Sequence, residues 1–126
     1  MAVIVRLGGG EYGYDLTNTS SLLSQSANSD GTTSSVTYTA TQEGEYMVIS
    51  TSGAAQANGY AYASASTSGT ILISAQDDNS NPNAIAFHGC SYYVIVSHLK
   101  VGQTISGSAR GSNTYGRSRV CIYQVS

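Results

Sequence analysis

The sequence predicts an all-β fold, a jelly-roll β-sandwich of about eight to ten antiparallel strands, in a single domain over residues 1–126. Short runs rich in β-branched and aromatic residues recur at intervals of about ten residues, which is typical of a sandwich. Gly, Ser, Asn and Asp fill the segments between these runs and favour turns. No stretch has the apolar spacing of an amphipathic helix, and the helix-favouring residues Leu, Glu and Lys are scarce.

The segment of residues 36–52 is central to this prediction. Its first run, Val36–Thr41, is rich in β-branched residues, and its second run, Tyr46–Ile49, is apolar, with Gly44 between them. Because Gly adopts the backbone angles of tight turns at little cost, we expect the two runs to pair as a hairpin. The second run does not alternate, so we expect a central strand with apolar surface on both faces; Tyr92–Val96 has the same pattern.

Further strands are expected before and after this hairpin. They are Ala2–Leu7, Glu11–Leu16, Gly59–Ser66, Thr70–Gln76, Ala84–His88, Ser91–Leu99, Thr104–Ala109 and Arg119–Val125. Residues 1–35 should contain the first two of these strands and a long polar loop, Thr17–Thr33. Tyrosine and serine alternate with alanine after Gly59, so Tyr60 and Tyr62 should point one way and the alanines toward another sheet.

Composition and charge exclude several classes of partner. The net charge is −2 with 5 Lys and Arg, so a basic surface for nucleic acid is absent. We interpret Arg110, Arg117 and Arg119 as part of a solvated loop around a Gly-rich turn. No stretch has the length of a transmembrane helix, so we expect no membrane insertion. The first residues lack the basic and long apolar regions of a signal peptide.

The residue types of nucleophilic and zinc chemistry occur near the two cysteines but do not form a recognisable set. His88 and His98 lie close in sequence to Cys90, yet a carboxylate partner and a fourth zinc ligand are missing. We therefore expect no enzymatic activity and no cofactor. Cys90 and Cys121 both adjoin β-type runs and are expected to be reduced thiols, unless their strands are neighbours and permit a disulfide.

One loop contains several hard oxygen ligands. Asp77, Asp78, Asn79 and Asn81 lie in the segment DDNSNPN and make it a weak calcium candidate. The spacing is not that of an EF-hand loop, and the bidentate Glu of such a loop is absent. We interpret the segment as a solvated turn and expect that no metal is required.

Two motifs resemble one family of jelly-roll domains. Tyr38–Val48 is similar to the segment with an aromatic residue, a turn and Gly-x-Tyr in tumour necrosis factor and the complement globular head. His98–Ile105 resembles the Leu-x-x-Gly-Asp-x-Val turn of the same group, with Gln103 in place of Asp. The resemblance covers residues 36–126 and implies a homotrimer that binds through its outer faces or apex. Related domains form the heads of phage fibres and bacterial surface proteins, whose composition is closer to this polar chain.

The tyrosines are the candidate interface or binding residues. The chain has 10 Tyr, 1 Phe and no Trp. Tyr suits strands, and it also suits binding surfaces because its ring is buried while its hydroxyl stays hydrated. We single out Tyr60, Tyr62, Tyr92 and Tyr93, although the sequence does not separate core from interface tyrosines.

The sequence thus predicts a non-enzymatic, trimeric structural or recognition domain. We expect the head of a phage fibre or a bacterial surface spike, located on a virion or cell surface. Its partners would be two further copies of the chain and a cell-surface glycan or protein receptor. The alternative is a monomeric carbohydrate-binding module, which is less favoured because the flat aromatic platforms of such modules favour Trp.

Overall fold

The structure is a computed structural model that describes residues 2–7, 10–15, 21–54, 60–77, 84–87, 90–112 and 116–126. These residues form eleven strands and no helix, so the described part of the chain has no helix that could cross a membrane. The strands are β1 (Ala2–Leu7), β2 (Gly10–Asp15), β3 (Ser21–Asn28), β4 (Ser34–Thr39), β5 (Gly44–Gly53), β6 (Tyr60–Thr67), β7 (Thr70–Gln76), β8 (Ala84–Phe87), β9 (Cys90–Leu99), β10 (Thr104–Gly111) and β11 (Arg117–Gln124).

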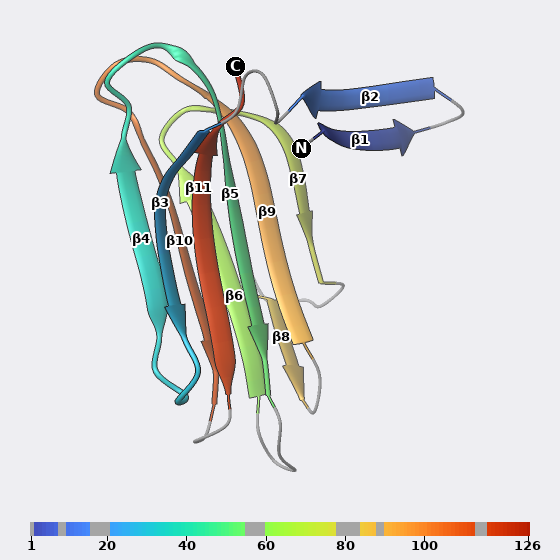
Figure 1. The fold of residues 1–126 in the computed structure, drawn as a ribbon, viewed down its shortest axis with the longest axis vertical. Helices are drawn as coiled ribbons and strands as arrows, with labels where there is room; N and C mark the ends of the chain where they lie inside the picture. The colour runs from blue at the N-terminus through green and yellow to red at the C-terminus, as the bar shows by residue number, and fades with distance from the viewer. Residues whose placement is uncertain are drawn as a thin grey trace.

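Nine strands form a sandwich of two antiparallel sheets (Figure 1). The order is β3-β11-β5-β9-β7 in the five-stranded sheet and β4-β10-β6-β8 in the four-stranded sheet, while β1 and β2 form a separate pair. If the edge strand β7 is set aside, the strands from β3 to β11 lie alternately in one sheet and the other, except that β6 and the next strand, β8, lie in the same sheet. This is the strand order of a jelly roll. The predicted all-β sandwich is therefore confirmed, and β5 is the central strand of its sheet.

The hairpin predicted within residues 36–52 is wrong. β4 pairs with β10, whereas β5 pairs with β9 and β11, so the chain crosses between the sheets through residues 40–43. The rings of Tyr38 and Tyr46 meet between the sheets with centroids 5.7 Å apart, and the Tyr46 hydroxyl donates a 2.7 Å hydrogen bond to the carbonyl of Gln42. The apolar side chains of the two runs share one core and face each other from opposite sheets. In a hairpin they would lie side by side in one sheet.

The long polar loop predicted over Thr17–Thr33 contains a strand instead. β3 pairs with β11 at the edge of the five-stranded sheet, and Leu23 packs against the core. An edge strand can be this polar because one neighbour satisfies half of its backbone groups and water satisfies the rest. The sequence of β3 therefore lacks the apolar alternation by which a strand is normally predicted.

The core lies between the two sheets and is narrow at its centre. Its fully buried members include Tyr46, Val48, Ile95, Leu99, Ile105, Val120 and Ile122. Ala61 and Ala63 of β6 are also fully buried, as the alternation of that segment predicted. Gly107 of β10 faces Val120, Val48 and Ser50, and a Cβ atom there would lie 2.7 Å from Val120 Cγ1 and 2.8 Å from Val48 Cγ2. The sheets approach closely at this point because Gly107 has no side chain.

Candidate functional site

The outer face of the five-stranded sheet, which points away from the core, is the candidate site. Directly paired residues of an antiparallel sheet point to the same side, so the strand register defines rows of outward side chains. Two rows cross β11, β5, β9 and β7: the first contains Tyr123, Met47, Val96 and Ile73, and the second contains Cys121, Ile49, Val94 and Ala75. Two further rows cross β11, β5 and β9: the third contains Arg119, Thr51 and Tyr92, and the fourth contains Arg117, Gly53 and Cys90. We call the first two rows the apolar half and the last two rows the arginine half.

The apolar half contains a second cluster, separate from the core. Met47, Val96 and Val125 are buried in it, and Ile49, Val94 and Tyr123 pack against them while staying partly exposed. Burial raises the pKa of the Tyr123 hydroxyl. β5 and β9 therefore carry apolar side chains on both faces, as predicted from their unalternating runs.

The edge strand β7 extends the apolar half with exposed side chains. Every residue from Thr70 to Gln76 is exposed, and Ile71, Leu72 and Ile73 keep 53%, 46% and 41% of their surface exposed. The register shifts between Ile71 and Ile73, so Ile71 pairs with inward-facing Ser97 and Ile73 with outward-facing Val96. Charged residues and Pro commonly protect an edge strand from pairing with another edge, and β7 contains neither.

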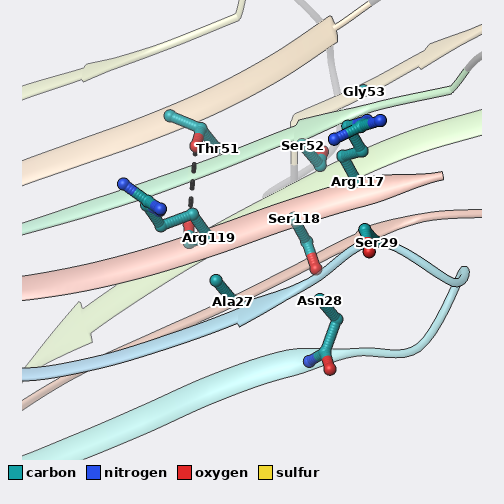
Figure 2. Close-up of a pocket in the computed structure, with 9 residues that line it drawn as sticks. All are labelled: Ala27, Asn28, Ser29, Thr51, Ser52, Gly53, Arg117, Ser118 and Arg119. Atoms are coloured by element: carbon teal, nitrogen blue, oxygen red, sulfur yellow. Dashed lines mark hydrogen bonds between the residues drawn. The ribbon is translucent and has the colours of Figure 1, made fainter.

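The arginine half contains a cavity of about 440 Å³. It is lined by the ends of β3, β5 and β11, including Arg117, Arg119, Thr51, Gly53 and Ser29. Figure 2 shows the two arginines toward opposite ends of the lining residues, with Ser118 between them on the same strand. Thr51 Oγ1 donates a long hydrogen bond of 3.5 Å to the carbonyl of Arg119.

Buried polar contacts hold the strand that carries both arginines. Ser118 Oγ lies 2.8 Å from Ser34 Oγ, and Asn28 Nδ2 donates a 3.0 Å hydrogen bond to the same Ser34 oxygen. The backbone N–H of Gly31, whose φ is +83°, donates to the carbonyl of Gly116 at 3.1 Å. The loop after β3 is thereby tied to the start of β11 and fixes the backbone beneath the cavity.

Arg110, Arg117 and Arg119 were interpreted as part of a solvated loop, and this interpretation is wrong. Arg110 belongs to β10, and Arg117 and Arg119 belong to β11, which begins two residues earlier than predicted. Residues two apart on a strand point to the same side, so this pair lies on one face. The spacing Arg-Ser-Arg indicates two arginines on one face of a strand, but only if the strand is known to begin at Arg117.

The structure does not gather the four candidate tyrosines into one site. Tyr60 and Tyr62 alternate with the buried alanines of β6 and lie on the far side of the four-stranded sheet, both partly buried. Tyr92 is exposed in the arginine half, and Tyr93 packs against the core. Their roles in assembly or binding stay predictions, now attached to separate surfaces.

The candidate metal and nucleophile residues are also placed in part. Asp77 is partly buried at the end of β7, and Asp78, Asn79, Asn81 and His88 lie outside the described residues. Within the described ranges, no three His, Cys, Asp or Glu side chains are grouped closely enough to hold a metal ion. His98 Nε2 lies 3.1 Å from Glu43 Oε1 on the surface.

The two cysteines do not form a disulfide. Cys90 of β9 is exposed and Cys121 of β11 is buried, and both are free thiols. Their strands lie on opposite sides of β5 and are therefore not neighbours. The disulfide that the sequence left open is excluded by this arrangement.

Comparisons with known proteins give one structural likeness. No family model matches the chain, and no curated protein matches it. The chain is similar to a chain in the structure of the tripod from the baseplate of bacteriophage Tuc2009, with a TM-score of 0.43 and 18% sequence identity. The match covers 86% of this chain and 65% of that chain, so the protein spans less than two thirds of its structural neighbour.

Proposed function

We propose that the chain is a non-enzymatic, homotrimeric recognition domain that forms the head of a phage fibre or a bacterial surface spike. The observation that carries the proposal is the exposed apolar strand β7 beside the apolar half of the outer face. A sandwich needs only the inner face of each sheet to form its core. An outward apolar cluster that continues into an exposed apolar edge is typical of a surface that another protein covers.

A second copy of the chain is the proposed cover. The row Tyr123, Met47, Val96 and Ile73 runs without interruption from β11 to β7. Ile71 and Ile73 are both exposed and lie on opposite faces of β7. A neighbouring chain that packs on one face of β7 would therefore leave the isoleucine on the other face uncovered. The edge of one copy and the outer face of the next are different surfaces, which makes the contact heterologous. Heterologous contacts that close form a ring of copies rather than a twofold dimer.

Three copies are favoured by the family resemblance of residues 36–126, which implies a trimer. The jelly-roll strand order supports that resemblance at the level of the fold. Binding would then fall to surfaces outside the apolar half. The arginine half, with its cavity and the exposed ring of Tyr92, is the described surface best suited to this role.

The rival function is a monomeric carbohydrate-binding module. It is favoured by the exposed Tyr92 near an open cavity, because an aromatic ring beside polar groups can pack against a sugar. It does not account for the apolar half or for β7, neither of which contacts the cavity. The two functions therefore predict different oligomeric states, a trimer for the recognition domain and a monomer for the carbohydrate-binding module.

Light scattering of the wild-type protein at micromolar concentration tests the proposal. Three chains of 13.0 kDa should give a single species of about 39 kDa. A monodisperse species of one chain mass would support the monomeric module and contradict the trimer.

A further inference from the structure

We propose that the cavity in the arginine half binds an anionic saccharide, meaning a sugar or polyol unit that carries a carboxylate or a phosphate group. The inference rests on the proposed recognition function and names the chemistry of its ligand. The cavity is present in the single chain, so its binding can be tested on a monomer as well as on an assembly. The cavity also lies on the half of the outer face that the proposed interface leaves uncovered.

The charge of the cavity favours an anion. Arg117 and Arg119 lie two residues apart on β11, so their Cα atoms are about 7 Å apart on the same face. Guanidinium groups match the oxygens of carboxylates and phosphates and can bind them through paired hydrogen bonds. The cross-strand neighbours of the two arginines on β5 are neutral, namely Thr51 and Gly53.

Two carboxylates lie near this surface: Asp77, whose backbone N–H donates a 3.3 Å hydrogen bond to the carbonyl of Tyr92, and Asp30, which is engaged in its own turn. Asp30 follows Ser29, and its Oδ1 accepts hydrogen bonds from Thr32 Oγ1 at 2.6 Å and from the Thr32 backbone N–H at 3.1 Å. These hydrogen bonds lower the pKa of Asp30. The carboxylate oxygen is thus directed at Thr32, and no acidic residue is among the described residues that line the cavity.

The cavity owes part of its space to a missing side chain. Gly53 ends β5 and pairs with Arg117, and a Cβ atom built there would meet no atom within 4 Å. Glycine in a strand allows a ligand to approach the backbone closely. A larger residue at this position would occupy the cavity without disturbing the packing around it.

Neutral groups around the arginines suit a hydroxylated ligand. Thr51 and Ser29 supply hydroxyl groups to the lining, and Tyr92 is paired with Thr51 on the adjacent strand with its ring exposed. Hydroxyls both donate and accept hydrogen bonds, and a tyrosine ring offers an apolar face with a polar tip. A nucleic acid would supply phosphate too, but it requires an extended basic surface, and this chain has 5 Lys and Arg in total.

The test is a titration of the full chain, followed by nuclear magnetic resonance. Glucuronic acid and glycerol 3-phosphate are the anionic probes, and glucose and glycerol are their neutral counterparts. We expect at least one anionic probe to bind about tenfold or more tightly than its neutral counterpart and to shift the amide signals of Thr51, Gly53 and Arg119. The probe that binds identifies carboxylate or phosphate as the preferred group.

Three variants make the test specific to the cavity. Arg119→Gln should weaken binding about tenfold by removing charge-assisted hydrogen bonds, and Gly53→Leu should abolish it by filling the space. Lys100→Gln removes an equal charge from an exposed turn and should leave binding unchanged. The inference is overturned if neither acid binds better than its neutral counterpart, if both variants behave like Lys100→Gln, or if an oligonucleotide binds more tightly than either acid.

Light scattering on the same samples separates this inference from the proposed function. Anion binding by a monomer would support the cavity and contradict the trimer. A trimer that fails to bind either acid would contradict only the cavity proposal.

Discussion

The substitution Leu72→Glu in β7 is expected to convert the proposed trimer into a folded monomer of 13.0 kDa. Leu72 lies where the register of β7 shifts, and 46% of its surface is exposed in the single chain, so a charge there costs the monomer little. In an assembly that covers β7, the same carboxylate would be buried without a partner, at a cost of several kcal/mol. Light scattering reports the mass, and circular dichroism reports whether the sandwich remains folded.

The matched control is Val101→Glu. Val101 is 67% exposed in the turn between β9 and β10 and is not part of β7. Its replacement introduces the same charge at an exposed apolar position. This variant should keep the mass of the wild type. If Leu72→Glu also keeps that mass, β7 is not part of the interface. The exposed apolar surface of β7 then no longer supports the proposed function.

The substitution Gly107→Val is expected to cause the largest loss of stability, about 3 kcal/mol or more in the free energy of unfolding. Any side chain at Gly107 meets Val120 and Val48 within 2.8 Å and also meets Ser50. All three neighbours are fully buried between the sheets, where side chains are closely packed. Urea unfolding followed by circular dichroism measures the change.

Gly53→Val is the control for the loss of a strand glycine. Gly53 has no neighbouring atom within 4 Å of a new Cβ, so this variant should unfold at nearly the same urea concentration as the wild type. Equal destabilisation by the two substitutions would show that the sheets do not pack closely at Gly107. No effect at either position would lead to the same conclusion.

The class of the fold was predictable because most of the strands carry a local signal. The apolar runs at Tyr46–Ile49 and Tyr92–Val96 indicated strands with two apolar faces, and both faces are apolar in the structure. The alternation in β6 correctly placed Ala61 and Ala63 toward the opposite sheet. These features depend only on residues close in sequence.

Strand pairing was not predictable in the same way. A turn near Gly44 is compatible with a hairpin or with a crossing between sheets, and the choice depends on which distant strands, β9, β10 and β11, occupy the neighbouring positions. β3 was missed because its stability comes from pairing with β11 and not from an apolar pattern of its own. Both errors concern contacts between residues far apart in the chain.

The candidate site was predictable only in part for the same reason. Tyr92 and Tyr93 were singled out together as candidate interface or binding residues, but Tyr92 is exposed and Tyr93 beside it packs against the core. The row that joins Arg119, Thr51 and Tyr92 crosses three strands and exists only in the folded sheet. The cavity therefore had no signal in the sequence beyond the spacing of its two arginines.

The most direct measurement for the central claim is native mass spectrometry of mixed labelled chains. Unlabelled and ¹⁵N-labelled chains would be unfolded together, refolded at micromolar concentration and weighed as intact assemblies. The proposed trimer predicts species with none, one, two or all three chains labelled. Single chains alone, or assemblies whose mass spectrum contains no more than two chains, would contradict it.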